Sequence, residues 1–320
     1  MAAFPAKAPT LQKTGALKYV KRYWTLYLLL LLPIAYFALF RYFPMQYIQL
    51  AFKKYMIMID GVKVNVWQMP WVDPWFDHFK TAFANKDFWN ALKNTLILNG
   101  LDLVVGFPAP ILLALLLNEL TFKKFKRVTQ TIAYMPHFLS WVIIYGLALQ
   151  LFAPSTGLVN DLIRALGGGG IDFLNNKTWW VFTYVILGVW QSIGWNTIIY
   201  LAAITGISPE LYEAAAVDGA GRFRKMWHVT LPGIRPTIVV LLIMQIGRIV
   251  GGDFDRPFAM TNKLVTDVST VIPIFTYNYG ILANKYGLAT AVGLFQSVVC
   301  VIFLLASNKL AEKFGERGIW

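Results

Sequence analysis

Six runs of mostly apolar residues recur along this chain, and each is long enough to cross a bilayer as a helix. Crossing takes about 20 such residues, and inside lipid the backbone must satisfy its own hydrogen bonds. The sequence therefore predicts an all-α protein, an integral membrane helical bundle of six transmembrane helices in a single domain. The predicted spans cover about 24–43, 94–117, 131–152, 180–203, 234–253 and 288–307.

The composition supports a membrane protein and argues against a nucleic-acid partner. Hydrophobic residues make up 57% of the chain and charged residues only 14%, whereas soluble domains carry about 25% charge. In a soluble protein the formal net charge of +13 would suggest nucleic-acid binding. Here the basic residues lie beside the apolar runs, so we expect them to orient the chain in a membrane and expect no nucleic acid among its partners.

The basic residues gather in alternate segments between the predicted spans, and this pattern predicts the orientation of the chain. Cytoplasmic loops carry the excess of Lys and Arg, so both termini are expected in the cytoplasm. The first span follows basic residues as a signal peptide does, but it is longer and lacks a cleavage site, so we expect a retained anchor. The orienting residues are Lys7, Lys13, Lys18, Lys21, Arg22, Lys123, Lys124, Lys126, Arg127, Arg222, Arg224, Lys225, Arg235, Lys309, Lys313 and Arg317.

The fourth connection, about 204–233, has the pattern of a helix, a glycine turn and a second helix. Ser208 is a good N-cap residue, and Pro209 suits the first helical position. Asp218-Gly219 is expected to end this helix, because glycine enters the left-handed region of backbone space freely. The sequence therefore predicts a folded cytoplasmic loop in this connection.

The surface of this loop suits contact with another protein. Ala214 and Ala215 give the first helix a low profile, which lets a partner approach closely. A second, amphipathic stretch follows, and Leu231-Pro232 is expected to end it before the fifth span. Its apolar side is expected to hold Phe223, Met226 and Trp227.

The same loop resembles the coupling loop in membrane subunits of ATP-binding-cassette (ABC) importers. Glu213-Ala214-Ala215, then Gly219, then Val229-x-Leu231-Pro232 matches the "EAA" motif of that family in spacing and in place between spans. The consensus has isoleucine where this chain has Val229, which is a mild departure. Other segments look like the carbohydrate branch of the family, which includes permeases for alginate or pectin fragments. These segments are 136–141, 157–160, 190–196 and 315–320.

The resemblance implies a division of labour among several chains in a bacterial inner membrane. The family works as two related permease subunits, two ATPase subunits that bind ATP and Mg, and an external solute-binding protein. This chain would be one permease, moving an oligosaccharide into the cytoplasm by alternating access, with its coupling loop seated on an ATPase subunit. The residues implied in that coupling are Glu213, Ala214, Ala215, Asp218, Gly219, Leu231 and Pro232.

The sequence has no recognisable motif for a cofactor, a metal or a catalytic site. It contains no G-x-x-x-x-G-K-[ST], and the run Gly167–Gly170 lies in an external connection, where a flexible loop is expected. The histidines His78, His137 and His228 lack partners at metal-ligand spacing, and no nucleophile elbow is present. We therefore expect no enzyme activity here and ATP hydrolysis on a separate subunit.

Polar residues in and beside the predicted spans mark a candidate substrate path. Ionisable side chains at membrane depth are costly and usually face a cavity. Arg248 is expected near the middle of the membrane, where it could meet sugar hydroxyls or carboxylates. The alternative is a structural pairing of Arg248 with Asp253, with a carbonyl group or with Asp102. The candidate path residues are Trp190, Gln191, Asn196, Gln245, Arg248, Asp253 and Arg256.

Two other classes of protein compete with this interpretation. An ion-coupled secondary transporter needs no ATPase and often shows two inverted halves, which are not visible in this sequence. A membrane enzyme would need a set of catalytic residues, and the sequence shows no convincing one. Within the importer interpretation, Arg248 and Arg256 favour a negatively charged oligosaccharide as substrate, because a low dielectric strengthens the attraction between opposite charges.

Overall fold

The computed structural model describes residues 20–315 and 318–319, which fold almost entirely into helices. Four helices are long and apolar enough to cross a membrane, and the number becomes six when each of two bent helix pairs forms one span. The predicted all-α membrane bundle is confirmed. The four helices are Trp24–Ala51, Lys86–Asn118, Lys177–Thr205 and Tyr286–Lys313, and the bent pairs are Lys123–Phe138 with Trp141–Leu151 and Arg222–Gly233 with Arg235–Gly247.

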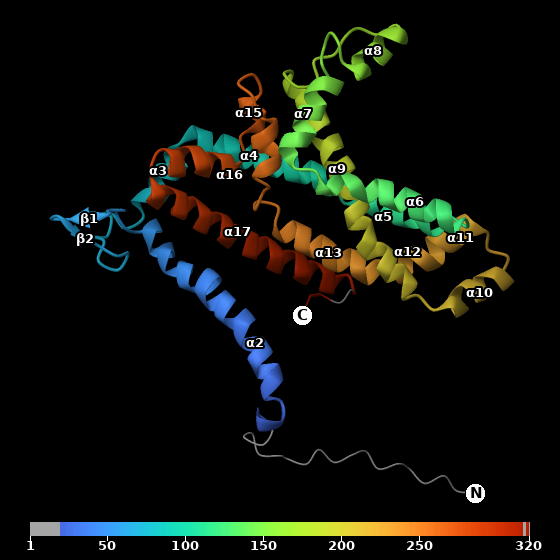
Figure 1. Cartoon of the computed structure of the whole chain (residues 1–320), viewed down its shortest axis with the longest axis horizontal. Helices are drawn as coiled ribbons and strands as arrows, with labels where there is room; N and C mark the ends of the chain where they lie inside the picture. The colour runs from blue at the N-terminus through green and yellow to red at the C-terminus, as the bar shows by residue number, and fades with distance from the viewer. Residues whose placement is uncertain (1–19, 316–317, 320) are drawn as a thin grey trace, which may run out of the picture.

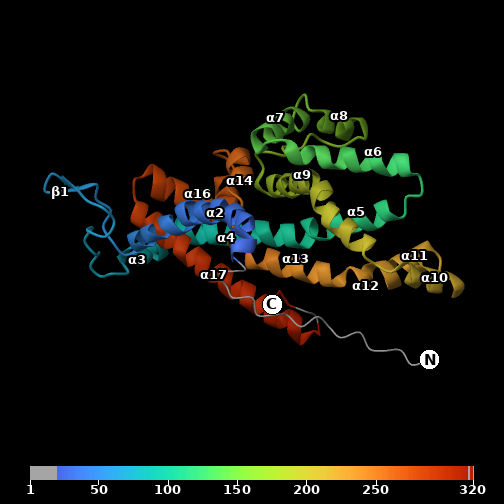
Figure 2. The ribbon, with the colours of Figure 1, turned by 60° about the horizontal axis from the view of Figure 1, so that its bottom comes forward.

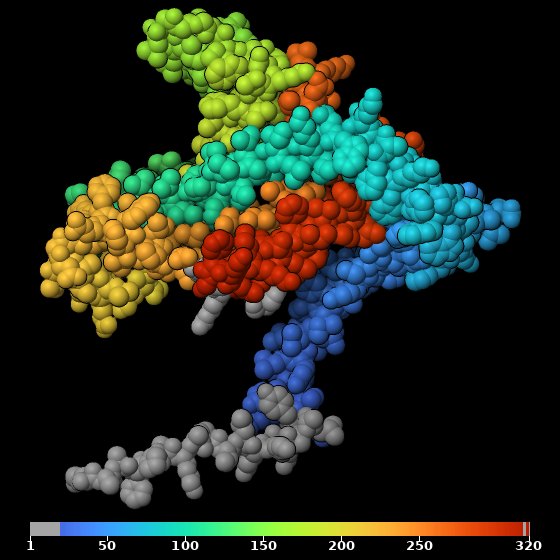
Figure 3. Space-filling view, turned by 180° about the vertical axis from the view of Figure 1, so that it is seen from behind, coloured from blue at the N-terminus to red at the C-terminus, as the bar shows by residue number. Residues whose placement is uncertain are grey.

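The first span leaves the bundle as an isolated apolar helix. It comprises α2 (Trp24–Phe37), the π-helical turn η1 (Ala38–Tyr42) and the 3-10 helix η2 (Phe43–Ala51). No side chain of α2 is buried, and α2 diverges from α17 (Tyr286–Lys313) toward the N-terminus (Figures 1 and 3). Its C-terminal extension η2 packs against α17. The described chain thus leaves the apolar surface of α2 uncovered.

The second, fourth and sixth spans are long helices that run past their predicted ends. The second span joins α4 (Lys86–Leu101), the π-helical turn η3 (Asp102–Gly106) and α5 (Pro108–Asn118). The fourth is α9 (Lys177–Thr205), which packs along α5, and the sixth is α17, which packs along α13 (Arg235–Gly247). Inside lipid these contacts depend on close packing and hydrogen bonds, because lipid tails are as apolar as the side chains.

The third predicted span, 131–152, is wrong as a single helix. The chain bends by 104° between two helices in this region. Pro136 lies at the start of a 3-10 turn, Leu139 is extended, and Ser140 caps the next helix by accepting a hydrogen bond from its backbone. The first helix of the pair packs against α9 (Figure 2). The elements are α6 (Lys123–Tyr134), η4 (Met135–Phe138) and α7 (Trp141–Leu151).

The entry to the fifth span also differs from the prediction. Leu231-Pro232 does not end the preceding helix, because proline lies in a first turn, where its missing N–H costs little. The break falls instead at Ile234, and α13 begins after a bend of 59°. The elements before the break are α10 (Pro209–Val217), α11 (Arg222–Lys225), the π-helical turn η5 (Met226–Thr230) and α12 (Leu231–Gly233).

The fifth span ends earlier than predicted, since α13 stops and the chain continues as turns. Asn99 of α4 donates a hydrogen bond to the carbonyl of Ile249 at 2.6 Å. Gln296 of α17 donates to the carbonyls of Val250 and Gly251 at 2.8 and 2.7 Å. These amides satisfy the carbonyls that the broken helix leaves without helical partners, as irregular backbone at membrane depth requires.

Several short elements lie at the two ends of the molecule. Figure 1 shows β1, β2 and α3 at one end, and α10 and α11 at the opposite end.

A hydrogen bond joins η6 (Thr276–Leu282) to the start of α4. Tyr279 donates this bond to the carboxylate of Asp87, and the bond raises the pKa of Tyr279 above its usual value. The remaining elements are β1 (Met58–Ile59), β2 (Val62–Lys63), α3 (Asp77–Ala84), α8 (Leu158–Ala165), α14 (Asp255–Met260), α15 (Thr266–Ser269), α16 (Ile272–Phe275) and η6 (Thr276–Leu282).

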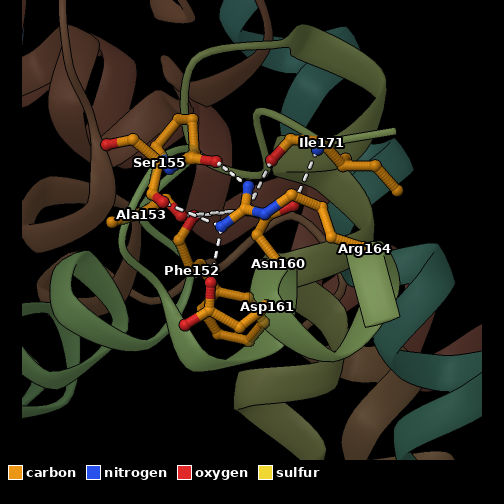
Figure 4. Close-up of polar contacts among 8 residues, drawn as sticks. Phe152, Ala153, Ser155, Asn160, Asp161, Arg164 and Ile171 are labelled. Carbon is orange, nitrogen blue, oxygen red and sulfur yellow. Dashed lines mark hydrogen bonds and ion pairs between the residues drawn. The ribbon is translucent and has the colours of Figure 1, made fainter. Parts of the chain in front are cut away.

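The connection between α7 and α9 is a compact module built around one buried amide (Figure 4). Asn160 of α8 is fully buried; its Nδ2 donates to the carbonyls of Ala153 and Ile171, and its Oδ1 accepts from the Ile171 N–H at 2.7 Å. Arg164 donates to two further carbonyls of the same loop. The predicted glycine run begins at Gly167, which ends α8 with φ of 85°. Hydrogen bonds therefore close this segment on itself.

Candidate functional site

A polar cavity of about 640 Å³ lies between the second, fourth and fifth spans, next to the break after α13. Its volume falls within the range of roughly 300–1,000 Å³ that is typical of small-molecule sites. Amides, hydroxyls and charges of both signs line it, and these groups suit a ligand rich in hydroxyls. The polar side chains on its wall are Asn99, Asp102, Ser192, Asn196, Tyr200, Gln245, Arg248, Asp253 and Arg256.

The structure brings most of the candidate path residues together in this cavity, and leaves two of them out. Trp190 and Gln191 do not line it. The Gln191 side chain turns instead toward the third span, where its Nε2 donates to the carbonyl of His137 at 3.3 Å. Contact with a substrate stays a prediction for all seven residues. Those on the wall are Asn196, Gln245, Arg248, Asp253 and Arg256.

Arg256 is buried and holds three elements together. Its Nη1 and Nη2 donate to the two carboxylate oxygens of Asp102 at 2.8 and 3.1 Å, and Nη2 also donates to the carbonyl of Tyr184 at 2.8 Å. The guanidinium lies 3.5 Å from the centroid of the Tyr184 ring. A Cβ at position 188 would lie 2.4 Å from its Cζ, so Gly188 makes room for it. Asp102 therefore pairs with Arg256, and the suggested pairing with Arg248 is wrong.

Arg248 has different surroundings from Arg256. It is the C-cap residue of α13 and is exposed on the cavity wall. Between residues 20 and 315 no carboxylate forms an ion pair with it. The nearby Asp253 instead accepts a hydrogen bond from the backbone N–H of Asp255 at 3.1 Å. Arg248 is thus a cation that the described chain leaves available to a ligand.

Sequence reasoning missed several residues of this site. Asn99 and Ser192 lie on the cavity wall and interrupt apolar runs, so the sequence held a signal that pointed to them. The partnership of Asp102 with Arg256 joins residues that are 154 positions apart, and no spacing rule reveals it. Gly188 carries no sequence signal, because its importance depends on the guanidinium that lies against it.

The second candidate site is the loop that contains α10, which the sequence assigned to coupling. Ser208 occupies its N-cap position, although its side chain makes no capping hydrogen bond. Gly219 follows the helix with φ of 76°, as expected. The N–H of Ala220 donates to the carbonyl of Ala215 at 2.8 Å, and the N–H of Gly219 donates to that of Ala216 at 3.0 Å. These two bonds form a Schellman motif, which sets the direction of the chain after α10.

This loop exposes apolar side chains at the end of the molecule. Met226 packs inward against the cluster around Ile234, so it does not share a face with Phe223 and Trp227 as predicted. Tyr212 ties α10 to the next segment through a hydrogen bond between its hydroxyl and that of Thr230. Four large apolar residues remain exposed to solvent. They are Leu211, Val217, Phe223 and Trp227, and their exposed fractions are 54%, 89%, 80% and 61%.

The other residues assigned to coupling occupy distinct positions on the same loop. Glu213 and Ala214 are exposed on α10, and Asp218 is its C-cap residue. Leu231 packs against the cluster around Ile234, whereas Pro232 is exposed. The exposed members could contact a partner directly, while Leu231 links the loop to the spans. Their role in coupling stays a prediction.

No group of His, Cys, Asp or Glu that could hold a metal ion occurs among the residues that the structure describes. A helical membrane bundle with a polar cavity at a broken span and an exposed helical loop is the architecture of a membrane transport subunit. The chain belongs to the family described as binding-protein-dependent transport system inner membrane component, which matches residues 106–314. Members of this family are inner-membrane transport subunits and are not enzymes.

Comparison with individual proteins supports this assignment over nearly the whole chain. The chain is 44% identical over 301 residues to protein LplB of Bacillus subtilis, covering 94% of this chain and 92% of LplB. It is 43% identical to the polygalacturonan/rhamnogalacturonan transport system permease protein YteP of Bacillus subtilis, covering 92% and 90% of the two chains.

A solved structure shares the fold. It is a bacterial alginate ABC transporter in complex with an alginate pentasaccharide-bound periplasmic protein. The match has a TM-score of 0.83 at 39% sequence identity, and it covers 95% of this chain and 99% of the other. The chain described here is therefore an ABC importer permease.

Proposed function

We propose that this permease carries acidic oligosaccharides, such as alginate or pectin fragments, through the inner membrane into the cytoplasm. ATP and Mg bind to two separate ATPase subunits, and an external solute-binding protein delivers the substrate. A second, related permease completes the path. Both termini of this chain lie in the cytoplasm.

The observation that carries the proposal is Arg248, which lies on the wall of the polar cavity and forms no ion pair with any described residue. A guanidinium can bind a carboxylate through two parallel hydrogen bonds, and the low dielectric of the membrane strengthens that pair. Gln245 and Asn196 on the same wall can bind hydroxyls. A uronic-acid oligosaccharide supplies both kinds of group.

The relatives support the same class of substrate. One matching solved structure is that of a bacterial ABC transporter involved in the import of the acidic polysaccharide alginate. YteP is a permease protein of a polygalacturonan/rhamnogalacturonan transport system. The exposed apolar side chains on the loop around α10 support a protein partner at that end, because apolar surface of this kind marks interaction sites. We assign this partner as an ATPase subunit.

The experiment reconstitutes the permease in proteoliposomes with its second permease, the ATPase subunits and the binding protein. Uptake of a labelled uronic-acid oligosaccharide is measured with ATP and Mg inside the vesicles and again without ATP. ATP-dependent uptake is expected, and it should require the binding protein.

Two other outcomes would separate the competing functions. Uptake driven by a proton or sodium gradient in the absence of ATP would indicate a secondary transporter. ATP-dependent uptake of a neutral oligosaccharide, without uptake of the acidic one, would retain the importer and reject the substrate class.

A further inference from the structure

The two arginines on the cavity wall differ in whether their charge is available. Arg248 faces the cavity without an acidic partner among the described residues, whereas both Nη groups of Arg256 are occupied by Asp102. The bidentate contact of Arg256 with Asp102 has the geometry that a substrate carboxylate would adopt. Asp102 thus occupies a site that otherwise fits an anionic group.

The charges on the wall balance one another. The charged residues there are two arginines, Arg248 and Arg256, and two aspartates, Asp102 and Asp253. With both carboxylates ionised, their formal charges sum to zero, so the whole cavity exerts no strong net attraction on an anion. Selectivity for an acidic ligand then depends on which individual charges are free.

The position of Asp102 allows a ligand to compete with it. The Asp102 side chain is 24% exposed, whereas that of Arg256 is 8% exposed, so the carboxylate is the more accessible partner. Asp102 is also the first residue of the π-helical turn η3 inside the second span. Such turns interrupt the regular helical ladder and are frequent at functional sites.

Arg256 itself is held in place independently of Asp102. Its Nη2 donates to the Tyr184 carbonyl, its guanidinium stacks on the Tyr184 ring, and Gly188 leaves the space it fills. The ring centroid of Trp141, the first residue of α7, lies 5.5 Å from the Cζ of this guanidinium. The guanidinium therefore has supports that remain when the Asp102 carboxylate is removed.

We propose that Asp102 is a specificity-determining counter-ion, which masks Arg256 and thereby limits the affinity of the cavity for acidic oligosaccharides. The proposal rests on the function proposed above only in the choice of acidic substrate. An incoming uronate carboxylate competes with Asp102 for the fork of Arg256. The mask lowers the affinity of the empty cavity for anions, so that a bound acidic substrate can leave.

The test compares uptake of an acidic oligosaccharide and a neutral one of equal length by the reconstituted complex, expressed as the acidic-to-neutral ratio of kcat/KM. Asp102→Asn should raise this ratio roughly tenfold, since a charge-assisted hydrogen bond becomes available to the substrate. KM for the acidic substrate should fall, and kcat should fall with it because release is slower. Uptake of the neutral substrate should change little.

Two further variants keep the test informative if Asp102→Asn assembles poorly. Arg256→Gln removes the guanidinium and leaves the Asp102 carboxylate without its cation. The acidic-to-neutral ratio of kcat/KM should therefore fall below that of the wild type. The double variant Asp102→Asn with Arg256→Gln should return the ratio close to the wild-type value. Asp253→Asn is the matched control, because it removes a carboxylate from the same wall without freeing Arg256, and it should raise the ratio less than Asp102→Asn does.

The results that would overturn the proposal are distinct from those that would reject the proposed function. An unchanged ratio in every assembled variant would assign the ion pair a purely structural role. An equal rise in Asp253→Asn and Asp102→Asn would show that net charge, and not Arg256, sets the preference. Failure of all these charge variants to assemble would show that the pair serves folding. If the wild type carries only neutral sugars, the proposed substrate class fails, whereas a gain of acidic uptake in Asp102→Asn still supports the mask.

Discussion

At the scale of single residues, the fold gives two arginines that are close in sequence opposite surroundings. Arg256 lies on α14, buried against spans two and four, and its charge is compensated by Asp102. Arg248 caps α13 and faces the cavity. The sequence marked both as path candidates, because an ionisable residue near a span indicates a functional site whichever way it points. Only the packing distinguishes a paired charge from an available one.

The first prediction concerns Arg248. Arg248→Gln should lower uptake of an acidic oligosaccharide by roughly 10- to 100-fold, because a charge-assisted contact worth about 1.5–3 kcal/mol is lost. Arg248→Lys should restore part of the uptake, since lysine keeps the charge without the planar fork. Uptake is measured in proteoliposomes, with size-exclusion chromatography to check assembly and a neutral oligosaccharide as the control substrate. Wild-type uptake of the acidic substrate by an assembled Arg248→Gln complex would remove Arg248 from the mechanism.

The second prediction concerns the buried amide of the module in Figure 4. Asn160→Ala removes hydrogen bonds to the Ala153 and Ile171 carbonyls and to the Ile171 N–H. It should destabilise the module by about 2–4 kcal/mol, because buried polar backbone groups lose their partners. Limited proteolysis between residues 152 and 171 should become faster, and the melting temperature should fall.

Asp161 supplies the matched control for this change. It lies next to Asn160 on α8, and its carboxylate makes an exposed ion pair with Arg164. Asp161→Asn should therefore cost at most about 1 kcal/mol and leave the proteolysis rate close to that of the wild type. Equal proteolysis rates for Asn160→Ala and the wild type would contradict the view that this amide holds the module together.

At the scale of elements, breaks and turns decide how the helices are used. The end of α13 exposes backbone carbonyls beside the cavity, and Asn99 and Gln296 satisfy them. At the other end of this span, α10 stops at a Schellman motif that depends on the left-handed conformation of Gly219. Positions with regular helical backbone accept more residue types than a left-handed position does. At Gly219 the conformation itself restricts the choice.

The third prediction tests the turn after α10. Gly219→Val places a β-branched residue at φ of 76°, which costs about 1–3 kcal/mol and should redirect the exposed surface of α10. Normal membrane insertion with loss of ATP-driven uptake is expected. Gly221→Val is a suitable control, because Gly221 has φ of −70° and a Cβ there would meet nothing within 4 Å. Uptake by Gly219→Val equal to that of the Gly221→Val control would exclude this loop as the coupling element.

At the scale of the whole molecule, the described chain is an open assembly with surfaces that other chains or lipid must cover. The helix α2 stands away from the bundle with no buried residue, and α10 and α11 expose apolar side chains at the opposite end from α3 (Figures 1 and 3). An isolated chain of this shape cannot enclose a transport path. This agrees with a subunit that works in a larger complex.

The fourth prediction concerns topology. Single cysteines are introduced at Gly169 and Lys313, which the structure describes, and at Lys13, which lies outside the described residues, in a Cys300→Ala background. The positive-inside rule places the connection around Gly169 outside and both termini inside. In intact cells an impermeant thiol reagent should label only the cysteine at position 169. Labelling at position 13 or 313 would overturn the orientation with both termini in the cytoplasm.

The sequence by itself determined the fold class, the apolar runs that can cross a membrane and the ends of α10, because these follow from local rules. A run of about 20 apolar residues crosses a membrane as a helix, and the Asp218-Gly219 pair favours a left-handed turn that ends the helix before it. The family resemblance came from the same kind of local signal, the short motif that contains Glu213. The class of protein could therefore be predicted from the sequence alone.

Only the tertiary structure decided where the spans break and which polar residues meet. At the bend between α6 and α7, which Pro136 favours locally, Gln191 of α9 donates to the carbonyl of His137, and after the early end of α13 Gln296 of α17 donates to that of Val250. The pairing of Asp102 with Arg256 joins residues that are 154 positions apart, so no local rule predicts it. Electrostatic and hydrogen-bonding partners are chosen by distance in space, and a separation of 154 positions along the chain carries no information about that distance.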